Sequence, residues 1–114
     1  RDMVEAPFGI GNIEVTFPLL YTELVTKKII ELQSLLALLQ IGPAKVMGWK
    51  QPSLEVGSVA DITVLDLQGS RAVNPTAFKS KAKFSPWAEQ TLQGWPVATF
   101  VRGKQVFGNA VTTK

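Results

Sequence analysis

The spacing of the apolar residues changes near Gly48, and no other feature of this sequence constrains its fold as much. Residues 14–28 carry apolar side chains at the spacing of a helix. Residues 31–40 place leucines around most of the circumference of a second predicted helix, which favours burial on more than one side. After Gly48, short β-branched runs between turn residues are typical of strands. The sequence therefore predicts an α/β chain in which two helices precede several strands.

Proline and glycine residues set the expected ends of the helices. Pro18 is compatible only with the first turn of the first helix, because proline has no backbone N–H to donate. Gly42 is expected to end the second helix, and Pro43 to begin a further helical turn that Gly48 stops. Residues 1–13 are predicted to form a loop.

The second half of the chain contains the predicted strands. Residues 62–65 form a short strand between Asp61 and Asp66. These two carboxylates project to opposite faces, so we interpret them as turn residues that bond local backbone and end the strand, not as an acid/base pair. The remaining expectations are a short strand or extended entry at residues 54–57, an irregular segment at residues 74–88, and a β-hairpin that reverses at Gly103 between residues 97–101 and 105–107.

The chain contains no histidine and no cysteine. Tetrahedral zinc sites are built from imidazole and thiolate ligands, so the sequence excludes a structural zinc site of that kind. It also excludes a Ser-His-Asp or Cys-His catalytic arrangement, which needs an imidazole base, and it excludes disulfides. We therefore expect this chain to bind no metal and to carry no self-contained catalytic group.

The charge pattern argues against nucleic acid and membrane partners. The formal net charge is only +3, and the one basic cluster, Lys79, Lys81 and Lys83, lacks the interleaved aromatics of a nucleic-acid surface. We interpret this cluster as a solvated loop. The longest uncharged stretch, residues 32–44, is too short to span a bilayer. No targeting peptide is recognised, and we expect a cytoplasmic protein.

The segment Gly9-Ile10-Gly11 before the first helix has two interpretations. Glycines ahead of a helix N-terminus can cradle a phosphate. However, Glu14 occupies the third glycine position of the nucleotide-binding fingerprint, and no clear strand precedes the segment. Flexible turn chemistry is therefore the favoured interpretation.

Three observations indicate a piece of a longer protein. The first residue is Arg1, not methionine, and a few short strands bury little surface without partners. The tryptophans at positions 49, 87 and 95 are interpreted as core or interface anchors. Together with the many leucines, they imply apolar faces that need cover from elsewhere.

Several sequence blocks closely resemble bacterial dihydroorotases of the amidohydrolase superfamily. The most specific is Glu5-Ala6-Pro7-Phe8-Gly9-Ile10, which is followed by a similar block at residues 14–22. Further blocks lie at residues 42–48, 54–66, 80–87, 92–97 and 102–104. The chain departs from the family at Gly42, where asparagine is usual and where glycine removes a side-chain cap, and at Gly11-Asn12.

The resemblance implies the C-terminal part of a (β/α)₈ metal-dependent amidohydrolase barrel and the C-terminal strands of its small β-domain. Residues 1–48 would be the last loop and helices of the barrel. Residues 49–114 would be the C-terminal part of the β-sandwich-like domain. The parent enzyme would hold two zinc ions on His, Asp and a carboxylated Lys, all preceding Arg1, so this chain would bind none.

The resemblance also implies a reaction. It is the reversible cyclisation of N-carbamoyl-L-aspartate to L-dihydroorotate in pyrimidine synthesis. In this chain only Phe8 and Gly9 match the family's substrate-binding loop, and no catalytic residue does. The expected partners are the small-molecule substrate, the remainder of the same polypeptide and a second copy in a homodimer. The open alternatives are another cyclic amidase, such as a hydantoinase or an allantoinase, and a non-catalytic assembly partner.

Overall fold

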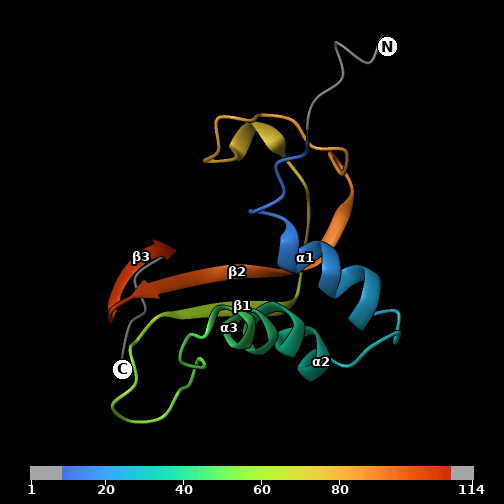
Figure 1. Ribbon diagram of the computed structural model, residues 1–114. Coiled ribbons are helices and arrows are strands. Elements are labelled where there is room, and N and C mark those ends of the chain that lie inside the picture. The colour runs from blue at the N-terminus through green and yellow to red at the C-terminus, as the bar shows by residue number, and fades with distance from the viewer. Residues whose placement is uncertain (1–8, 109–114) are drawn as a thin grey trace.

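The computed structural model describes residues 9–108, and it shows two helical segments beside one antiparallel sheet (Figure 1). The sheet has the strand order β1-β2-β3, in which both pairs are antiparallel. The predicted order of two helices and then strands is confirmed for these residues. The elements are α1 (Thr16–Leu20), η1 (Tyr21–Val25), α2 (Leu32–Leu36), η2 (Ala37–Ile41), α3 (Gly42–Met47), β1 (Ile62–Ala72), η3 (Pro75–Ala77), β2 (Thr91–Val101) and β3 (Lys104–Gly108).

The first helical segment, residues 16–25, is shorter than the predicted span. It begins late because Val15 closes a turn, donating its N–H to the carbonyl of Asn12 at 3.0 Å. Pro18 lies in the first turn as predicted and is buried. The segment ends with the i+5 bonding of η1, and the turn that follows places Lys28 at φ 59°.

The second helical segment does not end at Gly42, so that prediction was wrong. Gly42 is helical, with φ −58° and ψ −55°, and α2, η2 and α3 form one continuous helix over residues 32–47. Pro43 cannot donate to the preceding turn. The widened turn η2, in which the Gly42 N–H bonds to the Ala37 carbonyl, accommodates it. The expected loss of a side-chain cap at Gly42 therefore has no consequence, because the helix runs continuously from η2 through Gly42 into α3.

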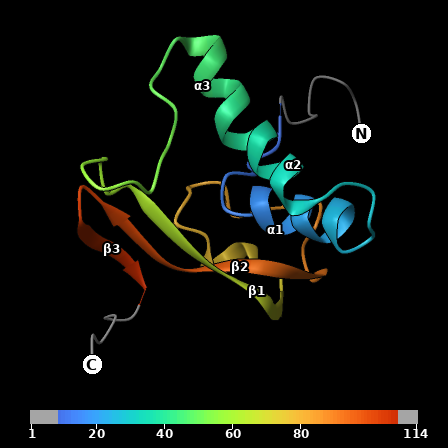
Figure 2. The same ribbon diagram turned by 90° about the horizontal axis from the view of Figure 1, so that it is seen from below.

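This second helix is much less buried than its leucines predict. Leu35 is 1% exposed, but Leu38 is 65% and Val46 is 86% exposed. Figure 2 shows why, because α2 lies beside the first helical segment while α3 projects away from the sheet. The prediction that this helix is buried on more than one side is therefore wrong within residues 9–108. Gly48 does end the helix as predicted, in the left-handed conformation at φ 70°.

Strand β1 continues past Asp66, where the sequence predicted its end. The Asp66 Oδ1 accepts hydrogen bonds from the N–H groups of Gln68 at 3.1 Å and Gly69 at 3.0 Å. These bonds stabilise a bulge, across which the register shifts before pairing resumes between Ser70 and Gln93. Asp66 does bond local backbone, but it bends the strand instead of ending it.

The reversal at Gly103 is confirmed. Arg102 and Gly103, with φ of 51° and 81°, join β2 to β3 in the left-handed conformation that tight hairpins require. Asp61 accepts a hydrogen bond from the Arg102 N–H at 2.8 Å, and Gly103 donates to the Ala60 carbonyl at 2.9 Å. Asp61 therefore holds a distant turn, which its interpretation as a local turn residue missed.

The other two predictions for this half differ in outcome. The prediction of a strand at residues 54–57 is wrong. These residues form a turn, in which the Ser58 N–H donates to the Glu55 carbonyl and Gly57 has φ 92°. Residues 74–88 are irregular as predicted, apart from the short η3.

The hydrophobic core crosses the predicted boundary at residue 48. Val15, just before α1, is buried in one cluster with Val73, Leu92 and Trp95 from the second half of the chain. Trp95 is the aromatic anchor of this core, and its indole N–H donates to the Leu92 carbonyl at 2.8 Å. Leu19, Phe78 and Trp87 pack around the cluster. The division into two domains stays a prediction.

Candidate functional site

Helix α1 lies unusually close to strand β2, and this contact shapes one side of the candidate site. Gly94 has φ 85°, and a Cβ atom there would lie 2.9 Å from the ring of Tyr21 and 3.2 Å from Phe17. Only glycine combines this conformation with this approach. Thr22 adds a polar bridge, because its hydroxyl accepts from the Gln93 N–H at 2.8 Å and donates to the Gln93 carbonyl at 3.3 Å.

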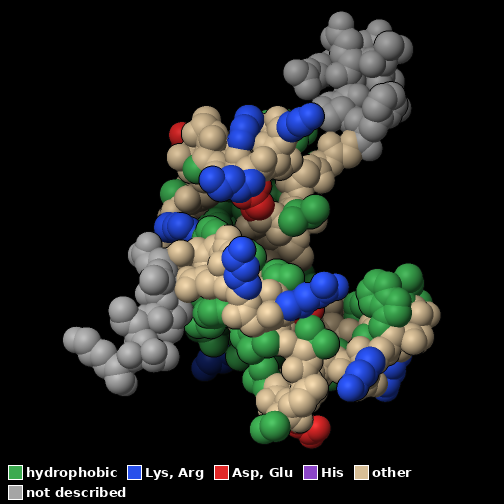
Figure 3. Space-filling view, turned by 90° about the vertical axis from the view of Figure 1, so that its left-hand side faces the viewer, with side chains coloured by type: hydrophobic (Ala, Val, Ile, Leu, Met, Phe, Trp, Pro, Cys, Tyr) green, Lys and Arg blue, Asp and Glu red, His purple; other side chains and the backbone are tan. Residues whose placement is uncertain are grey.

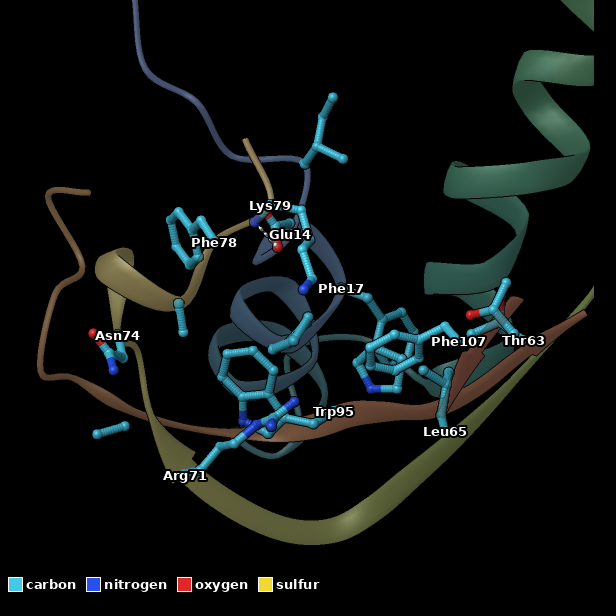
Figure 4. A pocket seen from close by; sticks show the side chains of 16 residues that line it. Glu14, Phe17, Thr63, Leu65, Arg71, Asn74, Phe78, Lys79, Trp95 and Phe107 are labelled. Carbon is cyan, nitrogen blue, oxygen red and sulfur yellow. Dashed lines mark hydrogen bonds between the residues drawn. The ribbon is translucent and has the colours of Figure 1, made fainter. Parts of the chain in front are cut away.

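A cleft of about 440 Å³ opens between α1, the sheet and the segment that follows β1 (Figure 4). Its walls are mostly apolar, and they include Phe17 and Pro18 from α1, Leu65 and Trp95 from the sheet, Phe107 from β3 and Phe78 from the loop. The Arg71 guanidinium lies 4.3 Å from the centre of the Trp95 ring, a cation–π contact at the floor of the cleft.

Glu14 occupies the upper rim of the cleft, facing the backbone of Lys79 (Figure 4). One carboxylate oxygen accepts from the Lys79 N–H and the other from the Ser80 N–H, each at 3.1 Å. Glu14 is partly buried, while Lys79 and Ser80 are exposed. In the space-filling view, several basic side chains gather on the upper part of the surface, above the hydrophobic side chains in the middle of the view (Figure 3).

The two residues predicted to bind substrate have different outcomes. Phe8 lies outside the described residues. Gly9 is exposed, its φ is outside the left-handed region, and a Cβ atom there would meet nothing within 4 Å. The contacts of this chain therefore do not explain why position 9 should be glycine, and its role in substrate binding stays a prediction.

The phosphate-cradle interpretation of Gly9-Ile10-Gly11 finds no geometric support. Helix α1 begins only at Thr16, after an intervening turn, so these glycines do not directly precede its N-terminus. The carboxylate of Glu14 also lies in that turn, where it would repel an anion.

The described residues contain no group of three or more His, Cys, Asp or Glu side chains that could hold a metal ion. The whole chain also lacks histidine and cysteine. The residues present therefore do not fit a zinc centre. What the cleft offers chemically is a mostly apolar surface with charged residues at its rim, among them Glu14 and Lys79. Within residues 9–108, no helix has the length and apolarity needed to cross a membrane.

Comparison with known sequences decides the family. The sequence model of the amidohydrolase family matches residues 3–106. This chain belongs to the amidohydrolase family. Its match covers both helical segments and nearly all of the sheet.

Relatives within the amidohydrolase family include bacterial dihydroorotases. The dihydroorotase of Deinococcus radiodurans is 50% identical over 107 residues, which cover 94% of this chain and 25% of that protein. The dihydroorotase of Thermus aquaticus is 48% identical over 105 residues, covering 92% of this chain and 24% of that protein. The chain thus spans about a quarter of the length of the curated relatives it matches. The predicted homology to dihydroorotases is confirmed.

Two solved structures share the fold of this amidohydrolase-family chain. L-Hydantoinase from Arthrobacter aurescens matches with a TM-score of 0.84 at 33% identity, covering 97% of this chain and 26% of that one. Dihydropyrimidinase from Brevibacillus agri NCHU1002 matches with a TM-score of 0.75 at 24% identity, covering 82% of this chain and 21% of that one. The second similarity concerns the fold alone.

Sequence reasoning missed three residues that organise the site: Glu14, Thr22 and Gly94. Glu14 and Thr22 bond to backbone 65 to 71 positions away, which no local spacing reveals. The only available signal was that Gly94 stands between Gln93 and Trp95 in an otherwise strand-like run.

Proposed function

We propose that this chain forms the C-terminal part of a dihydroorotase, which reversibly cyclises N-carbamoyl-L-aspartate to L-dihydroorotate. The observation that carries the proposal is 50% identity to a dihydroorotase over 94% of the chain. In this proposal residues 1–48 contribute the last loop and helices of a (β/α)₈ barrel, and residues 49–114 contribute strands of the small β-domain. The parent protein would be a cytoplasmic homodimer.

The catalytic groups of the proposed enzyme would come from the remainder of the polypeptide. A chain without histidine supplies no imidazole base and no imidazole ligand for the two zinc ions expected in the parent. Those ions would activate water and polarise the ring carbonyl when bound. This chain alone is expected to be inactive and free of stoichiometric zinc.

The contribution of this chain would be substrate binding by the backbone around Phe8 and Gly9. The open space beside Gly9 supports this role, because no residue among those described occupies the position that a side chain would take. A glycine with room around it lets a ligand approach the backbone closely.

The test uses the complete polypeptide that contains this chain and measures dihydroorotate hydrolysis. Gly9→Val should raise KM by about tenfold, the size of losing one or two hydrogen bonds, and should lower kcat less. The thermal midpoint should not change, because the added side chain meets nothing within the described residues. Gly48→Ala is the control outside this loop, since a Cβ there also meets no atom within 4 Å and KM should stay unchanged. An unchanged KM for folded Gly9→Val removes Gly9 from the site.

The second candidate function is that of another cyclic amidase. It is favoured by the structural match to L-hydantoinase, which covers 97% of this chain. Assays of the complete polypeptide with dihydroorotate, a 5-substituted hydantoin, dihydrouracil and allantoin separate the candidates. Turnover of dihydroorotate alone supports the proposal, turnover of another ring overturns it, and no turnover with metal bound favours a non-catalytic assembly partner.

A further inference from the structure

Two loops that are distant in sequence lie side by side, and the first of them contains Gly9 of the proposed substrate-binding loop. The first is the segment of residues 9–13 that leads from Gly9 into the turn before α1. The second is the segment of residues 78–83 after η3. They meet where Gly11 lies opposite Ala82, since a Cβ atom at Gly11 would be 3.7 Å from the Ala82 side chain.

Glu14 is the polar connection between these two loops. Its neighbour Val15 is fully buried in the core, so the backbone at this point is held firmly. Its two carboxylate oxygens each accept one backbone N–H, from Lys79 and from Ser80. Hydrogen bonds to an ionised acceptor are shorter and stronger than neutral ones. The backbone at Glu14 is fixed, and both oxygens of its carboxylate accept hydrogen bonds from the second loop. Glu14 therefore determines where the second loop lies.

We propose that Glu14 is a positioning residue, which holds residues 78–83 as a wall against residues 9–13 and so keeps the substrate-contacting loop in its binding geometry. The inference rests on the proposed function, in which the backbone around Gly9 contacts substrate. Without Glu14, the N–H groups of Lys79 and Ser80 lose their acceptors and the wall at Ala82 is released. The residues 9–13 then sample more conformations, and substrate binding must order them again.

This role predicts a particular kinetic signature. The loop contacts substrate equally in the ground and transition states, so its loosening removes uniform binding and raises KM without a matching fall in kcat. Glu14→Gln should behave as an intermediate. It keeps one acceptor oxygen for one of the two N–H groups and turns an amide N–H₂ toward the other.

The experiment uses the complete polypeptide and the variants Glu14→Ala, Glu14→Gln and Glu23→Ala. Glu23 is the matched control, an equally half-buried carboxylate in η1 whose partner is the Lys27 side chain and not a distant loop. Three quantities are measured: KM and kcat for dihydroorotate, the thermal midpoint, and hydrogen exchange at the amides of Lys79 and Ser80. Glu14→Ala should raise KM by about tenfold, equivalent to ~1.4 kcal/mol, with kcat within about twofold. Glu14→Gln should raise KM by about threefold, and Glu23→Ala should leave it unchanged.

The outcomes separate this inference from the proposed function. A wild-type polypeptide that does not turn over dihydroorotate overturns the proposed function, and the positioning role with it. An active wild type whose Glu14 variants exchange faster at Lys79 and Ser80 but keep the wild-type KM overturns the positioning role alone. Unchanged exchange in folded Glu14→Ala shows that the carboxylate does not hold the loop. If the Glu14 and Glu23 variants raise KM equally and lower the thermal midpoint equally, Glu14 has a merely structural role and the positioning role is overturned.

Discussion

The two helical segments of this chain are both rich in apolar residues, yet they differ sharply in burial. Residues 16–25 lie against β2, with Pro18 and the preceding Val15 fully buried and Thr22 bonded to Gln93. Residues 32–47 bury Leu35 but leave Leu38, Ile41 and Met47 exposed. Both patterns predict a helix with apolar side chains to bury. Among the described residues, the first is covered by the sheet, whereas the second is covered only in part.

The difference shows that periodicity reports the presence of an apolar face and not the element that covers it. A helix gains most of its stability from tertiary packing of that face. The first segment receives this packing from the sheet of its own chain. In the proposed parent enzyme the second would receive it from the remainder of the polypeptide. The following substitutions break or sharpen this comparison, beginning with the largest expected effect.

Gly94→Val should produce the largest loss, because it separates the first helix from the sheet. A branched side chain would have to adopt φ 85° and would overlap Tyr21 and Phe17. Strain and overpacking together should lower the free energy of unfolding by roughly 4 kcal/mol, measured by urea titration. Gly48→Ala is the control, since φ there is 70° but no atom lies within 4 Å. Its loss should be only about 1 kcal/mol from backbone strain. Equal losses at both positions would contradict close packing as the cause.

Leu35→Ala should lower the free energy of unfolding by about 3 kcal/mol, because Leu35 is buried and truncation leaves a cavity. Leu38→Ala, on the exposed side of the same helix, should change it by less than ~0.5 kcal/mol in the 114-residue chain. In the complete polypeptide, the Leu38 effect should rise above ~1 kcal/mol if the remainder covers that side. An equally small effect there would show that the second helix stays uncovered.

Thr22→Val should lower the free energy of unfolding by about 1–2 kcal/mol. It preserves the shape of the side chain but leaves the Gln93 N–H without its acceptor at the contact of helix and sheet. Thr26→Val is the matched control, because the Thr26 hydroxyl is exposed and bonds only within its own helical segment, to the Thr22 carbonyl. Comparable losses for the two variants would assign the effect to helix propensity.

Lys27→Ala should have the smallest effect, within ~0.5 kcal/mol, because its ion pair with Glu23 lies on the solvent-exposed side of the first segment. The measurement is again urea titration, at low and at physiological salt. A loss above ~1 kcal/mol that disappears in salt would show that surface charge, and not packing on β2, holds this segment.

Local chemistry accounts for what the sequence predicted well. Three correct predictions each depend on the conformational range of one or two residues: the chain reversal at Gly103, the position of Pro18 in the first turn of α1, and the end of the second helix at Gly48. Predictions failed where a neighbouring turn or a distant strand decided the outcome. Gly42 remains helical because the wider turn of η2 accommodates the missing N–H of Pro43. Strand β1 continues past Asp66 because its pairing with β2 resumes beyond the bulge.

The candidate site follows the same division. Composition alone determined that this chain supplies no imidazole and no thiolate ligand to a metal ion. Only the tertiary structure decided that Glu14 meets Lys79 and Ser80 and that Gly94 lies under Tyr21. These contacts join residues 65 or more positions apart, and no spacing rule encodes them. They form because burial of Val15 and Trp95 in one core brings the two halves of the chain together.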